Sequence, residues 1–291
     1  MMDAGRKEEK EAGGYNVARH SRANIFYEVK KMEVELLEQD KENKKLSFVI
    51  KGSNPIFVNT LRRMIMEEVP TLAIEDVEFR DNSSALYDEM IAHRLGLIPI
   101  KTDLKSYDLP SECSCKGKGC AKCTLKMTLT SKGAGYVYSK EIKSKDPKCV
   151  PAYPGIPIAK LSKGQKIELQ AKAILGQGKE HAKWVPGLVI YKNYPAIEIS
   201  SEGESCEEAS IKCPVNVFEF TKGKLTVVNP LNCHLCNACV DACPNGIKVK
   251  ESETDFIFTI ESWGQLDPKD MVKEALDRLG KKSDEFVKLL K

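Results

Sequence analysis

The stretch NPIFVNTLRRMIMEEVP, residues Asn54 to Pro70, predicts one amphipathic helix. Asn54 is a good N-cap, and Pro55 suits the first helical position because its missing N–H needs no partner there. Pro70 ends the helix, since the residue before a proline avoids the α region. The apolar side chains cover well over half of the helix circumference: Phe57, Val58, Leu61, Met64, Ile65 and Val69.

This apolar arc is broader than the stripe that a helix on the surface of a self-contained domain needs. Arg62 and Glu68 fall inside the arc, where a buried charge requires a partner. The pattern therefore favours a helix at an interface between two subunits. A central helix of an ordinary core explains the same pattern and stays open as the alternative.

Composition limits the class of protein. The 291 residues suffice for about two domains, or for one domain with insertions. A net charge of +3 is too small to indicate nucleic-acid binding by charge alone. Neither a membrane-spanning apolar run nor a signal peptide is recognisable, so we expect a cytoplasmic protein without a membrane partner. Eleven cysteines in that compartment indicate metal binding rather than structural disulfides.

Hydrophobic periodicity predicts an α+β fold. Residues 1–22 are charged and aperiodic, so we expect a disordered tail. A helix is predicted over 84–96, with Leu86, Met90, Ile91 and Leu95 on one face, and a final helix is predicted to start after the N-cap Asp267. Strands are predicted over 32–38, 46–51, 72–79, 125–130, 135–139, 165–175, 187–199 and 256–262.

The cysteines between residues 206 and 243 carry the more specific chemistry. Cys233-x2-Cys236-x2-Cys239-x3-Cys243-Pro is the bacterial ferredoxin run, in which the fourth cysteine binds the other cluster of a two-cluster fold. An upstream run has the same spacing but keeps only Cys206 and Cys213, with Gly203 and Ala209 at the other two ligand positions.

In a two-cluster ferredoxin each cysteine run gives its fourth cysteine to the other cluster. Applied to the two runs of this chain, this exchange leaves one site with all four ligands. We expect one iron–sulfur cluster, 4Fe–4S or its 3Fe–4S product, on Cys213, Cys233, Cys236 and Cys239. The second site lacks two ligands, and its remaining thiols, Cys206 and Cys243, can form a disulfide on oxidation. Zinc on the same cysteines is the alternative.

The first cysteine group is Cys113-x-Cys115-x4-Cys120-x2-Cys123. Four thiolates within this short loop suit a closed tetrahedral zinc site of the structural type. A set of reduced thiols without metal is the alternative. No catalytic constellation stands out in the chain, so we expect no catalytic residues and no enzymatic activity of the chain by itself.

Three stretches resemble one family. Asn59–Arg63 (NTLRR), Glu68–Ile74 (EVPTLAI) and Leu86–Pro99 (LYDEMIAHRLGLIP) are similar to the D subunits of archaeal RNA polymerases, which are related to the third-largest eukaryotic subunit and the bacterial α subunit. The resemblance runs from about residue 23 onward and implies a non-catalytic assembly subunit of a DNA-directed RNA polymerase.

The resemblance also implies a domain plan. A discontinuous, α-subunit-like dimerisation domain is expected over 23–71 and 251–291. A β-rich insertion domain with the zinc loop is expected over 72–197, and an inserted ferredoxin-like domain over 198–250. The zinc loop is similar to that of the eukaryotic subunit, and ferredoxin-like domains occur in a subset of the archaeal D subunits.

The family further implies partners. An α-like small subunit, the L subunit of the polymerase, is expected to pair with the chain, followed by the small N and P subunits and the second-largest catalytic subunit. We expect the interface with the L subunit to include Phe57, Leu61, Arg62, Arg63 and Ile65. No direct catalytic contact with nucleic acid is expected.

Two other classes of function remain as alternatives. An electron-transfer protein or redox-enzyme subunit would use the cluster, but it would need only residues 200–250. A free zinc protein that binds nucleic acid is the other, and the small net charge argues against it.

Overall fold

The computed structural model describes residues 32–290, so the predicted tail over 1–22 lies outside the described residues. Its first sheet has the strand order β1-β2-β12-β9, and all neighbours are antiparallel. The strands are β1 (Glu33–Asp40), β2 (Lys45–Lys51), β9 (Gly187–Ile199) and β12 (Ile247–Ser262). The carboxylate of Asp40 accepts hydrogen bonds from the backbone N–H groups of Glu42 and Asn43, which closes the predicted hairpin between β1 and β2.

The predicted helix after this hairpin is confirmed. Helix α1 (Pro55–Arg63) begins as expected, because the side chain of Asn54 accepts a hydrogen bond from the N–H of Phe57 at 2.8 Å. The helix then widens into a π-helical turn (Met64–Glu68), in which the N–H of Val69 bonds to the carbonyl of Met64. Strand β3 starts at Pro70, so the helix ends where the proline predicts.

The broad apolar arc of this helix is buried by its own chain. Val58 and Ile65 are fully buried, and Leu61, Met64 and Val69 are also in the core. Their cover comes from strands β2 and β12 and helix α5 (Pro268–Leu289). The inference that the arc needs a second subunit for its burial is therefore wrong, because a strand and a helix from the end of the chain cover it.

The charge inside the arc has partners, as the sequence requires. Lys282 on α5 and Lys179 place their ammonium groups 2.8 and 3.1 Å from the carboxylate of Glu68, and the amide of Gln177 donates to it at 3.1 Å. Burial opposes ionisation of Glu68, but the two ion pairs outweigh it and lower its pKa.

Helix α5 extends further than its buried face. Its N-cap Asp267 accepts from the N–H of Lys269 at 3.0 Å, as predicted. Met271 and Ala275 are fully buried, whereas Leu276 is partly exposed. The helix passes through Gly280 without a break, and its last two turns are exposed.

A second sheet with the order β3-β8-β4-β6 lies in the middle of the chain, beside a two-stranded sheet of β5 and β7. Helix α2 (Asp88–Gly96) packs on this core through Ile91 and Leu95, which are fully buried. The predicted helix over 84–96 is thus shorter at its start, and Met90 is exposed rather than buried. The strands are β3 (Pro70–Asn82), β4 (Leu125–Lys132), β5 (Gly135–Tyr138), β6 (Lys143–Ser144), β7 (Pro157–Leu161) and β8 (Lys166–Gln177).

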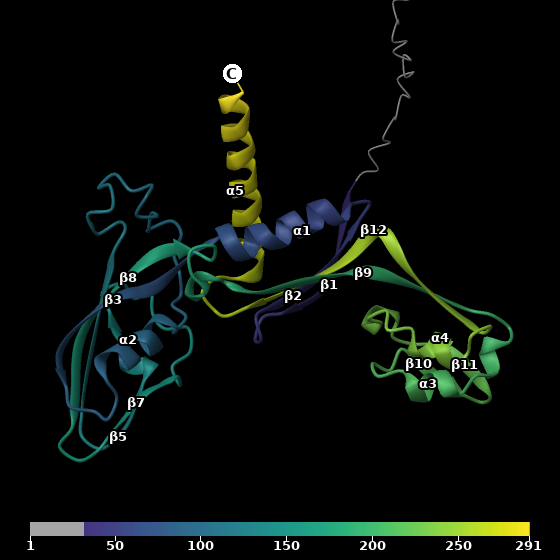
Figure 1. Ribbon diagram of the computed structural model, residues 1–291, viewed down its shortest axis with the longest axis horizontal. Coiled ribbons are helices and arrows are strands. Elements are labelled where there is room, and N and C mark those ends of the chain that lie inside the picture. The colour runs from purple at the N-terminus through teal and green to yellow at the C-terminus, as the bar shows by residue number, and fades with distance from the viewer. Residues whose placement is uncertain (1–31, 291) are drawn as a thin grey trace, which may run out of the picture. The chain divides into compact units, whose positions relative to one another are not determined.

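Strands β9 and β12 continue side by side beyond the first sheet (Figure 1). Their ladder runs from the pair Gly187–Ser262 to the pair Ile199–Ile247, with an irregularity between Glu251 and Phe256. The residues between the two strands form a small third core. Its elements are α3 (Glu208–Lys212), β10 (Phe218–Thr221), β11 (Lys224–Val227) and α4 (Ala238–Ala242). None of the described helices combines the length and apolar character needed to cross a membrane.

Candidate interface and metal sites

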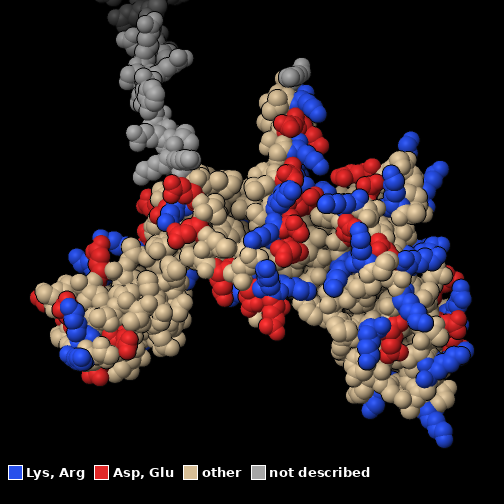
Figure 2. Space-filling model, turned by 180° about the vertical axis from the view of Figure 1, so that it is seen from behind, with Lys and Arg blue, Asp and Glu red and all other residues tan. Residues whose placement is uncertain are grey.

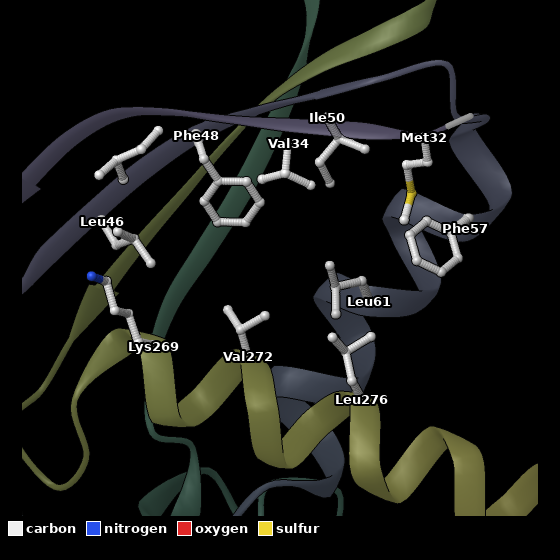
Figure 3. A pocket seen from close by; sticks show the side chains of 11 residues that line it. Met32, Val34, Leu46, Phe48, Ile50, Phe57, Leu61, Lys269, Val272 and Leu276 are labelled. Carbon is white, nitrogen blue, oxygen red and sulfur yellow. The ribbon is translucent and has the colours of Figure 1, made fainter. Parts of the chain in front are cut away.

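An open apolar groove lies where β1 passes beside the start of α5 (Figure 3). Its volume is about 410 Å³. Val34 and Leu36 on β1 are 63% and 55% exposed although they line the groove together with other apolar side chains. The full lining comprises Met32, Val34, Leu36, Leu46, Phe48, Ile50, Phe57, Leu61, Lys269, Val272 and Leu276.

The groove arises from the way the sheet is covered. Phe48 on β2 stacks on Phe258 of β12 with ring centroids 5.2 Å apart, and Phe258 is fully buried beneath the helices. Strand β1 is the edge strand next to β2, and its apolar side chains lie beyond this cover. An exposed apolar surface of this kind is typical of a protein–protein contact.

The interface residues expected from the sequence fall into three groups. Phe57 and Leu61 line the groove. Ile65 has no exposed surface, so it packs α1 into the core instead of lining the groove. Arg62 donates to the side chain of Asn59 at 3.2 Å, and Arg63 pairs with Glu67 at 3.0 Å, so both cations are held by their own helix.

The four cysteines of the first group converge. Their sulfur atoms all lie within 4.8 Å of one another. Cys113 and Cys120 are 3.5 Å apart, and Cys120 and Cys123 are 3.8 Å apart. With Zn–S bonds of about 2.3 Å, tetrahedral coordination sets sulfur–sulfur distances of roughly 3.8 Å. The thiols thus fit a single tetrahedral ion.

The local backbone brings these thiols together. Lys116, Gly117 and Gly119 all have positive φ angles, which allows tight turns of the backbone between Cys115 and Cys120. The N–H of Cys120 and the thiol of Cys123 donate to Cys115 and lower its pKa to about 6. Cys115 is therefore readily a thiolate, the form that binds metal.

The cysteines expected to bind iron are arranged more loosely. Cys233 and Cys239 are buried, Cys213 is half-buried and Cys236 is exposed. Burial raises the pKa of Cys239, and the thiols of Cys233 and Cys213 add to this effect. Within the described residues, only the 113–123 group has sulfurs spaced for one ion. A cubane cluster needs wider spacing, because each thiolate binds a different iron.

Backbone N–H groups already point at two of these sulfurs. The N–H of Val217 lies 3.4 Å from Cys213 Sγ, and the N–H of Leu235 lies 3.5 Å from Cys233 Sγ. Hydrogen bonds of this type stabilise thiolates and tune the potential of an iron–sulfur cluster. The donor set thus fits an iron–sulfur cluster.

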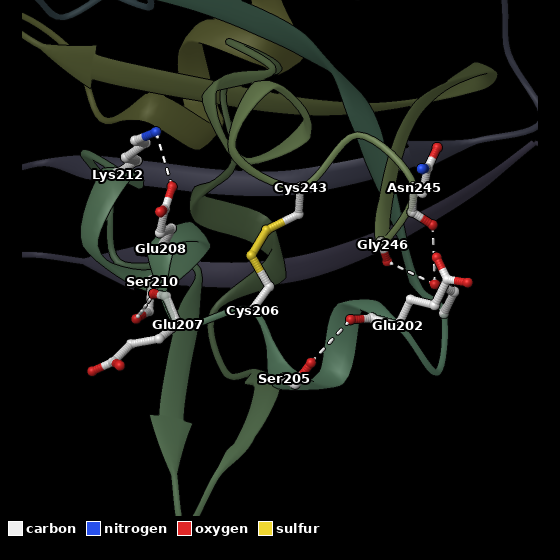
Figure 4. Close-up of a disulfide and its surroundings, with 11 residues drawn as sticks. Glu202, Ser205, Cys206, Glu207, Glu208, Ser210, Lys212, Cys243, Asn245 and Gly246 are labelled. Carbon is white, nitrogen blue, oxygen red and sulfur yellow. Dashed lines mark hydrogen bonds and ion pairs between the residues drawn. A yellow bond between two sulfur atoms is a disulfide. The ribbon is translucent and has the colours of Figure 1, made fainter.

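The site of the second cluster, which lacks two of its four ligands, is filled by the protein itself. Cys206 and Cys243 form a disulfide with Cα atoms 6.6 Å apart (Figure 4). Gly203 packs directly on Gly246, so that a Cβ at Gly203 would lie 2.1 Å from the carbonyl oxygen of Gly246. Ala209, at the other lost ligand position, is fully buried. Backbone and a small side chain therefore occupy these positions.

Cys149 belongs to neither group. It is fully buried, and burial raises its pKa to about 11. Such a thiol is unreactive and contributes to the core as a small apolar side chain.

Comparison with known families extends this picture. Residues 73–188 match the RNA polymerase Rpb3/RpoA insert domain, and residues 226–248 match the 4Fe-4S binding domain. The chain is 43% identical to DNA-directed RNA polymerase subunit Rpo3 of Methanosphaera stadtmanae over 88% of this chain and 97% of that protein. It is 40% identical to subunit Rpo3 of Methanosarcina acetivorans, covering 89% and 98%, and 40% identical to that of Archaeoglobus fulgidus, covering 89% and 97%.

These matches define the class as a non-catalytic subunit of a multi-subunit, DNA-directed RNA polymerase that carries a 4Fe-4S binding domain. The resemblance to the archaeal D subunits is confirmed. The chain belongs to the archaeal Rpo3 family of RNA polymerase subunits.

Proposed function

We propose that the chain nucleates assembly of its polymerase by pairing with the α-like small L subunit through the apolar groove. The observation that carries this proposal is the exposure of Val34 and Leu36 in a groove that also contains the core residues Leu46, Phe48, Ile50 and Leu61. An apolar helix or strand pair of the partner fits this chemistry. Obligate interfaces of this kind are more apolar than transient ones.

The test uses substitutions that leave the core of the chain intact. We expect the double variant Val34→Glu and Leu36→Glu to lose pairing, because both side chains are exposed alone but would be buried as charges in the complex. Ile65→Glu is a poor test because Ile65 is fully buried. Ile211→Glu, at a 75% exposed apolar residue on α3, is the matched control.

The measurement is gel filtration of each variant co-expressed with the L subunit. Loss of the heterodimer in the groove variant, with the Ile211→Glu variant still paired, is the expected result. If the groove variant pairs like the unmodified chain, the L subunit binds another surface and the groove needs a different occupant.

The domain plan supports two stages of assembly. We place the discontinuous dimerisation domain at 23–71 and 251–291, the insertion domain at 72–197 and the ferredoxin-like domain at 198–250. The N and P subunits and the second-largest catalytic subunit would join after the pair with the L subunit has formed. In this scheme the ferredoxin-like domain offers a contact surface for these later partners.

The two sets of four cysteines suit two different metal centres. Cys113, Cys115, Cys120 and Cys123 would hold a structural zinc ion, for which their spacing is suited. Cys213, Cys233, Cys236 and Cys239 would hold one cluster, 4Fe–4S or 3Fe–4S after loss of one iron. Bound there, the cluster supplies a one-electron couple. Its bonds to the four cysteines would also link Cys213 covalently to the 233–239 segment of the small third core.

Metal analysis of anaerobically purified protein tests both assignments. We expect about four iron atoms and one zinc ion per chain, by the ligand numbers of the two sites. Iron near eight per chain would contradict the closed second site, and absence of zinc would leave the first group as free thiols.

An electron-transfer protein is the weaker proposal. Relatives align with nearly the whole chain, including the parts that a ferredoxin would not need. Lysines and acidic residues are interspersed over the face drawn in Figure 2, which also offers little support for a free nucleic-acid-binding protein.

A further inference from the structure

A lysine of the first sheet reaches into the loop that carries the first cysteine of the ferredoxin run. Lys192 lies on β9 and pairs in register with Ile257 on β12. Its ammonium donates to the carbonyl of Leu231 at 2.6 Å and to that of Cys233 at 2.9 Å. Two short bonds to carbonyls on either side of Asn232 hold this turn against the sheet.

The side chain of Lys192 lines a cavity between the first sheet and the 231–239 loop. A cavity of about 620 Å³ is lined on one side by Ser47 and Thr259 of the sheet, and on the other by Leu231 and Asn232. Within residues 32–290, the hydrogen bonds that the side chains of the first sheet donate to the 231–239 loop come from Lys192.

This ammonium differs from the other lysines of the region. Lys212 pairs with Glu208, and Lys224 pairs with Glu204. Both of these lysine side chains are more than half exposed. Lys192 is half-buried, and no carboxylate lies within ion-pair distance of it among the described residues. Its positive charge is thus directed at the ligand loop and is less screened by solvent.

The chemistry of the cluster makes such a charge effective. One-electron reduction adds one negative charge to a cluster and its thiolates and breaks no bond. A fixed cation nearby stabilises the reduced form, and net charge and hydrogen bonding are known determinants of cluster potential. For unit charges about 10 Å apart in an effective dielectric of about 20, Coulomb's law changes an equilibrium constant by somewhat more than tenfold.

We propose that Lys192 is a positioning residue that raises the reduction potential of the cluster on Cys213, Cys233, Cys236 and Cys239 by holding its charge against the Cys233 loop. Because Lys192 lies on the first sheet, that sheet contributes to the reduction potential of the cluster in addition to the groups that surround the cluster directly. This inference rests on the proposed cluster, and on no particular partner for the groove.

The experiment is a redox titration of the full chain, purified without oxygen, with dithionite as reductant and dye mediators. We expect Lys192→Met to lower the ratio of reduced to oxidised cluster at a given potential about tenfold, which is 59 mV for a one-electron couple. Lys192→Arg keeps the charge and should stay near the unmodified chain. Lys224→Met removes an exposed, paired lysine and should leave the potential unchanged.

A further variant separates charge from hydrogen bonding. Lys192→Gln can still donate but carries no charge, so it should titrate like Lys192→Met. An unchanged potential in Lys192→Met, or equal shifts in Lys192→Met and Lys192→Arg, would overturn the proposal. If Lys192→Met incorporates too little iron to titrate, a lower potential in Lys192→Gln than in Lys192→Arg supports the proposal, and equal potentials overturn it.

Failure of the underlying cluster assignment looks different. In that case the unmodified chain itself lacks iron and the visible absorption of a cluster. A shift in potential is then not measurable in any variant, and iron analysis of the unmodified protein identifies this outcome before the titration.

Discussion

The two cysteine-rich regions reach their proposed metals by different routes. The zinc-loop thiols come from residues 113–123 and converge through local turns of the backbone. The cluster thiols come from Cys213 and from the 233–239 loop, which two long strands and a third core hold together. The first site is a property of one loop, whereas the second depends on the fold around it.

This contrast predicts where damage spreads. Metal loss from a local loop should stay local, because the second sheet beneath the loop has its own core. Metal loss from the cluster region should unfold a whole core, since four of its eight buried residues are cysteines or alanine rather than large apolar side chains.

The largest expected effect follows from replacing Cys213, Cys233, Cys236 and Cys239 together with Ser. All iron should be lost and the third core should unfold, while pairing with the L subunit survives. Once the Cys206–Cys243 disulfide is reduced, the link between β9 and β12 lengthens roughly tenfold, which costs on the order of 2 kcal/mol by loop-closure scaling.

Pull-down with the L subunit, and then with the remaining polymerase subunits, checks this prediction. Pairing should be retained and later assembly should fail. If pairing with the L subunit is lost while both chains stay soluble, the cluster region is needed for the interface with the L subunit. The damage would then not stay within the cluster region, contrary to the prediction.

The second effect concerns the disulfide. Cys206→Ser with Cys243→Ser should retain the iron but destabilise the cluster region, because the bond closes a loop with a sequence separation of 37. Chain entropy for such a loop corresponds to about 4 kcal/mol as an upper value. Thermal unfolding followed by the visible absorption of the cluster measures it. Loss of iron from this variant would show that one of these two thiols is a ligand.

The third effect tests the closed second site. Gly203→Ala places a Cβ against the carbonyl of Gly246 and should destabilise the cluster region by about 1–3 kcal/mol through overpacking. The matched control is Gly155→Ala, because a Cβ at Gly155 meets no atom within 4 Å and its φ is not positive. Equal stability of Gly203→Ala and the unmodified chain would contradict the tight backbone contact.

The smallest global effect is expected at the zinc loop. Cys115→Ser with Cys120→Ser should abolish zinc binding and leave the iron content and the pairing with the L subunit unchanged. Limited proteolysis should cut within 113–123 much faster, because the loop loses its cross-link. A drop in iron content in this variant would mean that the two regions are coupled after all.

Much of this molecule is predictable from sequence where the signal is local. Asn54, Pro55 and Pro70 define both ends of α1 and its π-helical turn, and Asp267 starts α5. The cysteine spacing predicts the convergence of the 113–123 thiols and the pairing of Cys206 with Cys243, because ligand spacing follows the geometry of the metal.

Features that depend on distant residues were not predictable in the same way. The arc on α1 is covered by β12, and nothing within 54–70 indicates that strand. The contact between Gly203 and Gly246 and the reach of Lys192 to Cys233 arise only when β9 and β12 pair. Met90 fits a helical stripe but lies outside the buried face, because α2 starts later and packs through Ile91 and Leu95.

The pairing of Ile199 with Ile247 has a consequence for modularity. Because these residues are antiparallel neighbours at the end of a ladder, the whole stretch 200–246 is topologically a β-hairpin loop. A two-residue turn such as Asn-Gly can close the same hairpin. The cluster region can therefore be removed, or exchanged for another small domain, without a change in the order or connection of the strands in the rest of the chain.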